Sequence, residues 1–318
     1  MAEIHATELP ASPGAATMSP PRPRSLDRLA IALMLLCCLS WGVQQVLAKL
    51  ALAELTPIWQ AAIRSAGGTL VVGAWALWRE PGIFRRDQSF WPGIAIGVIF
   101  ALEFLALFVG LQWTSASHAA LFLYTAPFFV ALGAAFLLPQ EGLRRGQWLG
   151  LAFSFVGVAL ALGVSTQNGV TPLIGDLLTL AAGACWAATT LLAKATKLRS
   201  LPATKVLLYQ LVVSTLLLSI AALVVGEPFP THLSFVPAAS LLYQIIWIAG
   251  FTYLVWFWLL RSYHAGEMSS FTFVTPLVGV LAGHFLLGDS LDAGLIIAVA
   301  LVLIGIGLVN RPAKPGRP

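Results

Sequence analysis

Long apolar segments follow one another along nearly the whole chain, and they limit the fold more than any other feature of the sequence. Ten runs occur, each close to the roughly 20 residues that an α-helix needs to cross a bilayer. The runs cover residues 29–50, 57–78, 90–113, 116–138, 147–164, 172–193, 204–226, 235–260, 267–288 and 291–310. Only short turns separate them. The sequence therefore predicts an all-α integral membrane protein with ten transmembrane helices.

Composition excludes the soluble classes of protein. Of the 318 residues, 58% are hydrophobic and only 10% are charged, whereas a soluble domain carries about 25% charged residues. All three cysteines, Cys37, Cys38 and Cys185, lie inside apolar runs and lack the spacing of a metal site. We therefore expect no disulfide, no metal and no cofactor.

The basic residues predict the orientation of the chain, because Lys and Arg favour the cytoplasmic ends of transmembrane helices. With the amino terminus inside, all of the 18 basic residues except Lys49 and Arg64 fall in cytoplasmic segments. This sorting explains the net charge of +5 without a nucleic-acid partner. Residues 1–27 and 311–318 are expected to be cytoplasmic tails, the first of them disordered because it is polar and rich in Pro and Ser.

The two halves of the membrane region resemble each other weakly. Trp41 recurs as Trp186 and Pro127 as Pro276 at nearly the same shift along the chain. The proposed repeats are residues 28–164 and 172–310. Because each repeat contains five helices, an odd number, the second enters the membrane from the opposite side, and such inverted repeats place a binding site near the membrane midplane. Chance similarity between apolar helices is the alternative.

The repeat resembles the EamA-like members of the drug/metabolite transporter superfamily. The stretches that carry the resemblance are Ser40-Trp41-Gly42, Cys185-Trp186, Arg64, Pro127 and Pro276. The resemblance implies two inverted five-helix halves, with the first four helices of each half around a central cavity and the fifth peripheral. It also implies transport of small metabolites, amino acids among them. The sequence departs from the family pattern at Pro139-Gln140-Glu141 and Gly288-Asp289-Ser290. Both stretches lie at loop ends, so we expect little effect on function.

Two ionisable residues lie inside predicted membrane helices. A charge near the bilayer centre costs roughly 2.5–3.5 kcal/mol on insertion scales and marks a functional site by default. We predict that Arg64 binds a carboxylate or phosphate of the substrate, and that Glu103 pairs with Arg64 or carries a proton. Gln210 occupies the position of Arg64 in the second repeat. The alternatives are that Arg64 extends to the headgroups and that Glu103 is a protonated structural residue.

Uncharged polar and aromatic side chains complete the predicted site. Gln44 and Gln244 are predicted to form a polar lining together with Tyr124, because buried amides need partners. Trp41 and Trp186 are predicted to form walls or gates of an apolar pocket. Hydrogen bonding between helices and ordinary core packing are the alternatives.

Two prolines and two histidines are further candidates. Pro127 and Pro276 each remove a backbone hydrogen bond, so they are predicted hinges, with static kinks as the alternative. His118 and His284 lie near the outer ends of their helices. For both, a hydrogen-bonded interfacial histidine is favoured over a proton relay.

These features predict a secondary transporter of small organic metabolites in the cell (inner) membrane, not an enzyme. It would work by alternating access, and proton coupling is an expectation that comes from the resemblance. A multidrug or nucleoside-type efflux carrier of the same fold is the first alternative. The alternatives of other classes are a membrane-embedded lipid-modifying enzyme and a channel. Expected partners are the solute, the lipid bilayer and protons, and a homodimer is left open.

Overall fold

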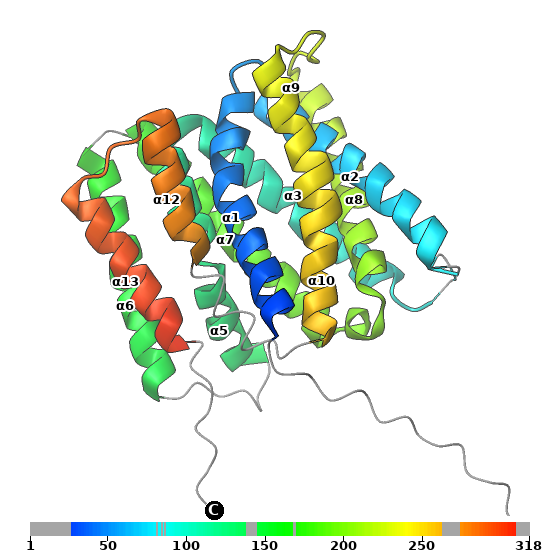
Figure 1. The fold of residues 1–318 in the computed structure, drawn as a ribbon, viewed down its shortest axis with the longest axis horizontal. Coiled ribbons are helices and arrows are strands. Elements are labelled where there is room, and N and C mark those ends of the chain that lie inside the picture. The colour runs from blue at the N-terminus through cyan, green and yellow to red at the C-terminus, as the bar shows by residue number, and fades with distance from the viewer. Residues whose placement is uncertain are drawn as a thin grey trace, which may run out of the picture.

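The computed structural model describes residues 27–80, 82–83, 85, 87–137, 145–167, 170–262 and 274–309. All regular elements in these ranges are helices (Figure 1). The first half contains α1 (Arg28–Ala51), α2 (Pro57–Arg79), α3 (Phe90–Trp113), α4 (Ala116–Leu123), α5 (Ala126–Leu137) and α6 (Arg145–Gln167). The second half contains α7 (Val170–Ala195), the 3₁₀-helix η1 (Lys197–Ser200), α8 (Ala203–Val225), α9 (Phe235–Leu242), the π-helix η2 (Tyr243–Thr252), α10 (Tyr253–Ser262), α12 (Val274–Leu287) and α13 (Ala293–Val309).

The helices lie in the predicted apolar runs, but the fourth run differs from the expectation of one continuous helix. It contains two helices, α4 and α5, with a turn at Tyr124 and Thr125. Pro127 explains the interruption, because proline has no N–H and disfavours helical backbone in the residue before it. The Thr125 hydroxyl donates to the carbonyl of Phe122 at 2.6 Å, which satisfies groups at the end of α4. Pro127 therefore lies in the first turn of α5, where a missing donor costs little.

The run predicted over 235–260 forms three consecutive helical elements, α9, η2 and α10. The middle element is a π-helix of 10 residues, and π-helical turns are rare and concentrate at functional sites. The run predicted over 267–288 is described only from Val274, so its earlier residues lie outside the described ranges.

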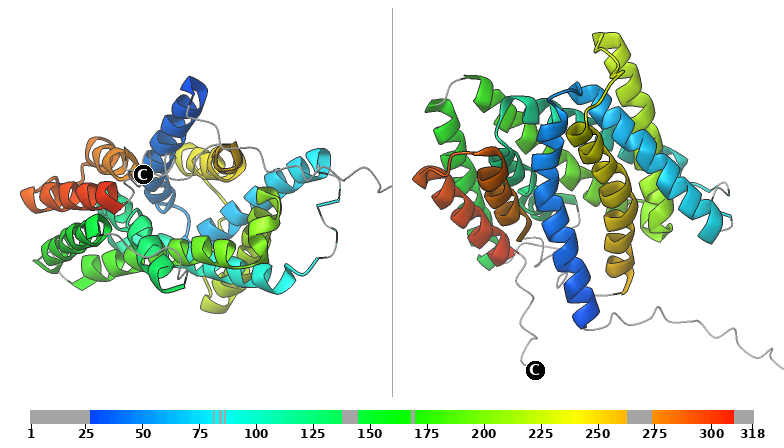
Figure 2. Two further views of the ribbon diagram at one scale, coloured as in Figure 1. Left: turned by 90° about the horizontal axis from the view of Figure 1, so that it is seen from below. Right: turned by 45° about the horizontal axis from the view of Figure 1, so that its top comes forward.

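Helix pairs from the two halves build the bundle. α6 packs against α13, and the two lie side by side at one edge (Figure 2). α2 packs against α8, α3 against α7 and α8, and α1 against α12 and α9. The largest buried apolar cluster lies between these helices and includes Trp41, Phe104, Phe108, Leu211 and Ile248.

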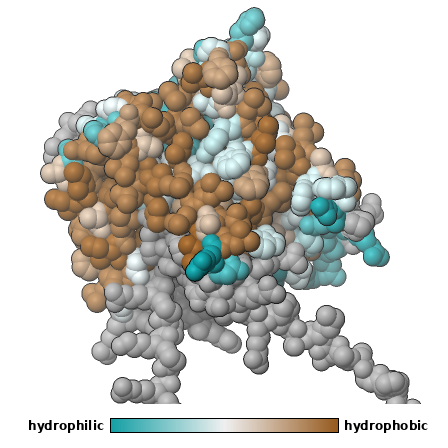
Figure 3. Space-filling view, viewed as in Figure 1, coloured by the Kyte–Doolittle hydropathy of each residue, from teal (hydrophilic) through white to brown (hydrophobic). Residues whose placement is uncertain are grey.

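The exterior of the bundle is apolar. Figure 3 shows hydrophobic residues over most of one face, and exposed large apolar side chains include Leu70, Phe136, Val224 and Phe235. Five helical segments in the described ranges are long and apolar enough to cross a membrane, by length and composition. They are Arg28–Ala51, Phe90–Trp113, Val170–Ala193, Ala203–Val225 and Phe235–Trp256. This surface suits contact with lipid tails.

Candidate functional site

Arg64 on α2 is fully buried, with a side chain 0% exposed. Its Nη2 donates to the hydroxyl of Tyr253 at 3.1 Å. The guanidinium carbon lies 4.0 Å from the ring centroid of Phe104, which is the geometry of a cation–π interaction. The two remaining nitrogens, Nε and Nη1, are buried without a hydrogen-bond partner. Arg64 therefore does not extend to the membrane surface, and it keeps free donors inside the bundle.

Glu103 on α3 precedes Phe104 and is also buried, with 6% exposure. It interacts electrostatically with Arg64. The ion pairs within 4.0 Å that occur in the described ranges are His118–Asp176 and Lys205–Asp87, so Glu103 and Arg64 are further apart than a direct pair. Glu103 Oε2 has no hydrogen-bond partner. A buried guanidinium and a buried carboxyl group thus lie in one region, and neither satisfies the hydrogen-bonding groups of the other.

Tyr253 at the start of α10 lies at the centre of this region. Its ring is 6.5 Å from that of Trp41, and Trp41 lies 5.5 Å from Trp256. Trp41 Nε1 donates to Thr252 Oγ1 at 2.9 Å, which orients the indole. Our sequence prediction did not include Tyr253. The available signal was a hydroxyl group inside an apolar run that already contained several polar residues.

Tyr124 extends the same region toward α7. It lies in the turn between α4 and α5 and interacts electrostatically with Glu103 and Tyr253. Its ring meets that of Trp186 on α7 edge to face at 5.4 Å. The structure thus brings together Arg64, Glu103, Tyr124, Trp41 and Trp186 among the predicted site residues.

The predicted glutamines are all buried. Gln44 on α1 and Gln210 on α8 are 5% and 8% exposed. Gln244 in η2 is 0% exposed, and neither of its amide atoms has a hydrogen-bond partner. In the described part of the chain, no hydrogen bond joins Gln44 to Gln244 or Gln210 to Arg64. A polar lining made by Gln44 and Gln244 stays a prediction.

Helix α1 is attached to η2 next to this region. Trp247 Nε1 donates to Ser40 Oγ at 2.8 Å, and the Tyr243 hydroxyl donates to the Ser40 carbonyl at 2.9 Å. These bonds position Trp41, the next residue on α1. Side chains of η2 thus hold the part of α1 that carries Trp41.

The predicted prolines lie in α5 and α12. Pro127 is in the first turn of α5, and Pro276 is buried in α12, which packs against α1. A Cβ at Gly42 on α1 would lie 2.6 Å from Val278 side-chain atoms, so this contact is close. The hinge role of the two prolines stays a prediction.

His118 and His284 both make hydrogen bonds. Nδ1 of His118 lies 2.8 Å from the carboxylate of Asp176, and Nδ1 of His284 lies 2.8 Å from the carbonyl oxygen of Asp289. Asp176 lies inside the apolar run 172–193 and was missed by the sequence prediction. The signal was present, because an acidic residue within such a run needs a partner.

An apolar helical bundle that buries an arginine among aromatic rings has the features of a multi-pass membrane protein. The model of the EamA-like transporter family matches residues 28–163 and 173–311. The chain belongs to the EamA-like transporter family and is a multi-pass transporter of the cell (inner) membrane.

Curated relatives span almost the whole chain. An uncharacterized transporter, YvbV, from Bacillus subtilis is 30% identical over 92% of this chain and 94% of its own length. A probable amino-acid metabolite efflux pump from Salmonella typhimurium is 26% identical over 86% and 92%. An S-adenosylmethionine/S-adenosylhomocysteine transporter from Chlamydia muridarum is 27% identical over 89% and 92%. A crystal structure of a protein with 19% identity superposes with a TM-score of 0.64 over 89% of this chain and 96% of that chain, which shows a shared fold.

Proposed function

We propose that the chain is a secondary transporter of small organic metabolites that carry an anionic group, amino-acid metabolites among them. It works by alternating access between two inverted five-helix repeats that together cross the membrane ten times, with both termini in the cytoplasm. The observation that carries this proposal is the buried guanidinium of Arg64, which keeps two nitrogens without partners. Leaving such donors unpaired is costly unless a ligand pairs them in the working protein.

Contacts between α6 and α13 support the inverted repeat. A Cβ at Gly157 on α6 would lie 2.8 Å from the carbonyl oxygen of Ala298 and 2.9 Å from Val302. A Cβ at Gly305 on α13 would meet the carbonyl oxygen of Gly150 at 2.5 Å and Ser154 Oγ at 2.2 Å. The shift that relates Gly157 to Gly305 also relates these partners, Gly150 to Ala298 and Ser154 to Val302. Reciprocal contacts of this kind are what a two-fold axis between the repeats produces.

Helices α2 and α8 repeat the same reciprocity. The Glu227 carboxylate, which follows α8, accepts from Ile58 N at 3.1 Å at the start of α2. Glu80, which follows α2, accepts from Thr204 Oγ1 at 2.7 Å at the start of α8. Each helix therefore binds, near its own carboxyl end, the first turn of the other. This arrangement requires the two helices to be antiparallel, as inverted repeats demand.

The surroundings of Arg64 favour one class of solute. A carboxylate or phosphate accepts hydrogen bonds from a guanidinium in a planar, charge-assisted pair. Phe104, Tyr253 and Trp41 offer ring surface to an apolar portion of the same solute. A purely cationic drug would be repelled by Arg64, so this site favours metabolite transport over cationic multidrug efflux. The names of two relatives, which mention amino-acid metabolites and S-adenosylmethionine, agree with solutes that carry a carboxylate.

A thermal-shift screen tests the proposed substrate class. The purified protein is melted with amino acids, nucleotides and their uncharged amide or nucleoside analogues. A ligand at 100 times its Kd stabilises the folded state by about 2.7 kcal/mol, so binding is visible as a higher melting temperature. We expect stabilisation by some carboxylates or phosphates and not by their uncharged analogues, and loss of that difference in Arg64→Gln. Equal stabilisation by charged and uncharged analogues would contradict the role of Arg64.

A labelling experiment tests the inverted repeat separately. Val170 begins α7, and Ser200 ends η1 shortly after α7 ends. We expect Val170→Cys to react with an impermeant maleimide added outside the cell, and Ser200→Cys to react only from the cytoplasmic side. Reaction of both from one side would overturn the topology.

A further inference from the structure

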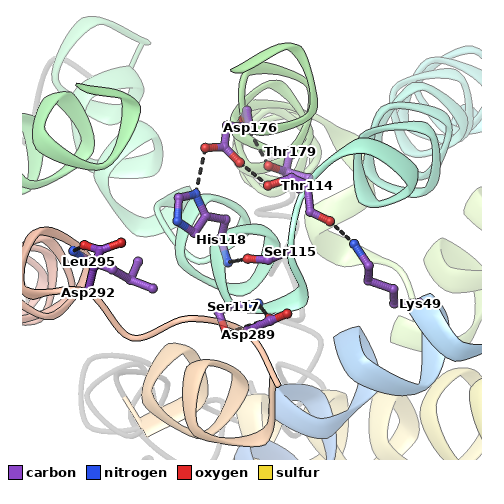
Figure 4. Close-up of polar contacts among 10 residues, drawn as sticks. All are labelled: Lys49, Thr114, Ser115, Ser117, His118, Asp176, Thr179, Asp289, Asp292 and Leu295. Atoms are coloured by element: carbon purple, nitrogen blue, oxygen red, sulfur yellow. Dashed lines mark hydrogen bonds and ion pairs between the residues drawn. The ribbon is translucent and has the colours of Figure 1, made fainter. Parts of the chain in front are cut away.

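A second group of polar side chains lies at the end of the bundle where α1 and α3 finish. Figure 4 shows it. We call it the outer polar cluster, because the proposed topology places this end outside. The cluster consists of Lys49, Thr114, Ser117, His118, Asp176 and Asp289.

Asp176 on α7 joins the second repeat to the first. Its carboxylate is 0% exposed. It accepts from Thr114 Oγ1 at the end of α3 and lies 2.8 Å from His118 Nδ1 on α4. Thr179 Oγ1 donates to the backbone carbonyl of Asp176 at 2.9 Å, which holds this turn of α7 in place.

Asp289, between α12 and α13, joins the repeats a second time. Its carboxylate accepts from Ser117 N at 2.9 Å and from Ser117 Oγ at 2.8 Å, at the start of α4. The approach is close, because a Cβ at Gly283 would lie 2.4 Å from Ser117 Oγ and 2.5 Å from Asp289 Oδ2. Asp176 and Asp289, two acidic residues of the second repeat, thus both hold the segment between α3 and α4 of the first.

Lys49 of α1 contributes a positive charge to this cluster. The Lys49 ammonium donates to the carbonyl of Leu111 at 3.3 Å and to that of Thr114. It also interacts electrostatically with Asp289. Lys49 thus supplies one positive charge near Asp289, while the buried Asp176 carboxylate lies against the His118 imidazole.

Imidazole is the side chain that ordinarily gains or loses a charge between pH 5 and 8, and His118 supplies the imidazole of this cluster. Its side chain is 13% exposed, so solvent reaches it from this end of the bundle. Among the described residues, the charged and titratable groups at this end of the elements packed around α4 are Lys49 of α1, Asp176 of α7, His284 and Asp289 of α12 and the following loop, and Asp292 before α13. Glu103 of α3 and Arg28 of α1 lie further along their helices, Glu103 about three turns from Thr114. Asp292 accepts from Leu295 N at 2.8 Å and so caps its own helix.

We propose that the outer polar cluster is a proton-binding gate. A proton taken from the outer solution binds His118, converts its hydrogen bond with Asp176 into an ion pair, and holds α4 against α7 so that the outer side is closed. Loss of that proton weakens the contact and favours opening to the outside. The inference rests on the proposed topology, and it predicts that external acid returns an exporting carrier to the state open to the cytoplasm.

Hydrogen–deuterium exchange of the intact protein in nanodiscs tests the proposal without a known solute. Exchange is followed between pH 5.5 and 8 in peptides that cover Thr114 to Leu123 and the first turns of α7, after correction for the chemical rate. We expect about fivefold stronger protection at pH 5.5, the difference between a charge-assisted and a neutral hydrogen bond. Unchanged protection in the wild type across this range would overturn the proposal, and this measurement needs no variant.

Variants assign the effect to His118. His118→Gln keeps a side chain that can donate to Asp176 but does not titrate, so its protection should not depend on pH. His284→Gln is the matched control at the same end of the bundle and should keep the wild-type response. A pH response that survives in His118→Gln, or disappears in His284→Gln, would refute the assignment. A failed solute screen would leave this exchange response intact, so the two proposals fail independently.

Discussion

Replacing Arg64 by methionine separates a transport role from a structural one. Methionine fills a similar volume without charge. The variant loses the hydrogen bond to Tyr253, worth about 1.5–3 kcal/mol for a charged group, and the cation–π contact with Phe104, worth about 2 kcal/mol when desolvated. It also removes a buried charge that costs roughly 2.5–3.5 kcal/mol on insertion scales and two unpaired nitrogens at about 1–3 kcal/mol each.

The removed costs, about 4.5–9.5 kcal/mol, are at least as large as the lost contacts, about 3.5–5 kcal/mol, so the variant without solute should melt no lower than the wild type. A structural arginine in a satisfied buried pair would instead cost about 3–5 kcal/mol on removal. Melting is followed by tryptophan fluorescence in nanodiscs, and solute exchange by counterflow in liposomes. We expect Arg64→Met to keep its stability and to lose saturable counterflow of anionic solutes.

The matched control is Arg79→Met. Arg79 is exposed, and its guanidinium carbon lies 4.0 Å from the ring centroid of Trp78, the same distance as Arg64 from Phe104. Exposed cation–π contacts are worth about 0.5–1 kcal/mol, so this variant should change neither stability nor counterflow appreciably. A loss of more than about 3 kcal/mol in Arg64→Met, the range of a broken buried pair, would refute the reasoning and make Arg64 structural.

Three other predictions concern different parts of the chain. Glu103→Gln should abolish pH-driven uptake while leaving counterflow at constant pH; unchanged pH dependence would remove Glu103 from coupling. Gly157→Leu should separate α6 from α13 and lower the melting temperature, because its Cβ would lie 2.8 Å from a carbonyl oxygen of α13. The control Gly146→Leu should not lower the melting temperature, because no atom lies within 4 Å of the added Cβ. In the loop before α3, hydrogen bonds from Lys205 and Ser89 lower the pKa of Asp87 from 3.8 to about 2. The contribution of ionised Asp87 to folding stability is therefore lost only as the pH falls through that range. Asp87→Asn should leave the pH dependence of the melting temperature between pH 5 and 8 unchanged.

The helical segments could be predicted from the sequence because a chain inside lipid must satisfy its backbone hydrogen bonds within each segment. Apolar length alone therefore locates such helices. It could not show that the fourth run breaks at Tyr124, since Pro127 is compatible with a kink, a break or a new helix start. The local bond from Thr125 to Phe122 decides between these outcomes.

The site was predicted less completely, because depth along a helix does not say which way a side chain points. We predicted that Gln44 and Gln244 line one site from their depth in the membrane alone, and depth does not show where either side chain points. η2 is π-helical, with hydrogen bonds to the fifth residue instead of the fourth. Its side chains therefore leave the helix at angles that a period of 3.6 residues does not predict. The direction of the Gln244 side chain therefore does not follow from its depth.

Helix α3 connects the candidate site with the outer polar cluster. Phe104 on α3 stacks on Arg64, while the carbonyl of Leu111, about two turns further along the same helix, binds Lys49. The Thr114 hydroxyl, directly after α3, binds Asp176. Because an α-helix moves as a rigid body over two or three turns, a shift of α3 that loosens Thr114 from Asp176 also displaces Phe104 from Arg64. A solute held by Arg64 would then alter the protection of Thr114 to Leu123 in exchange experiments, and a double variant of Arg64 and His118 should show effects that do not add.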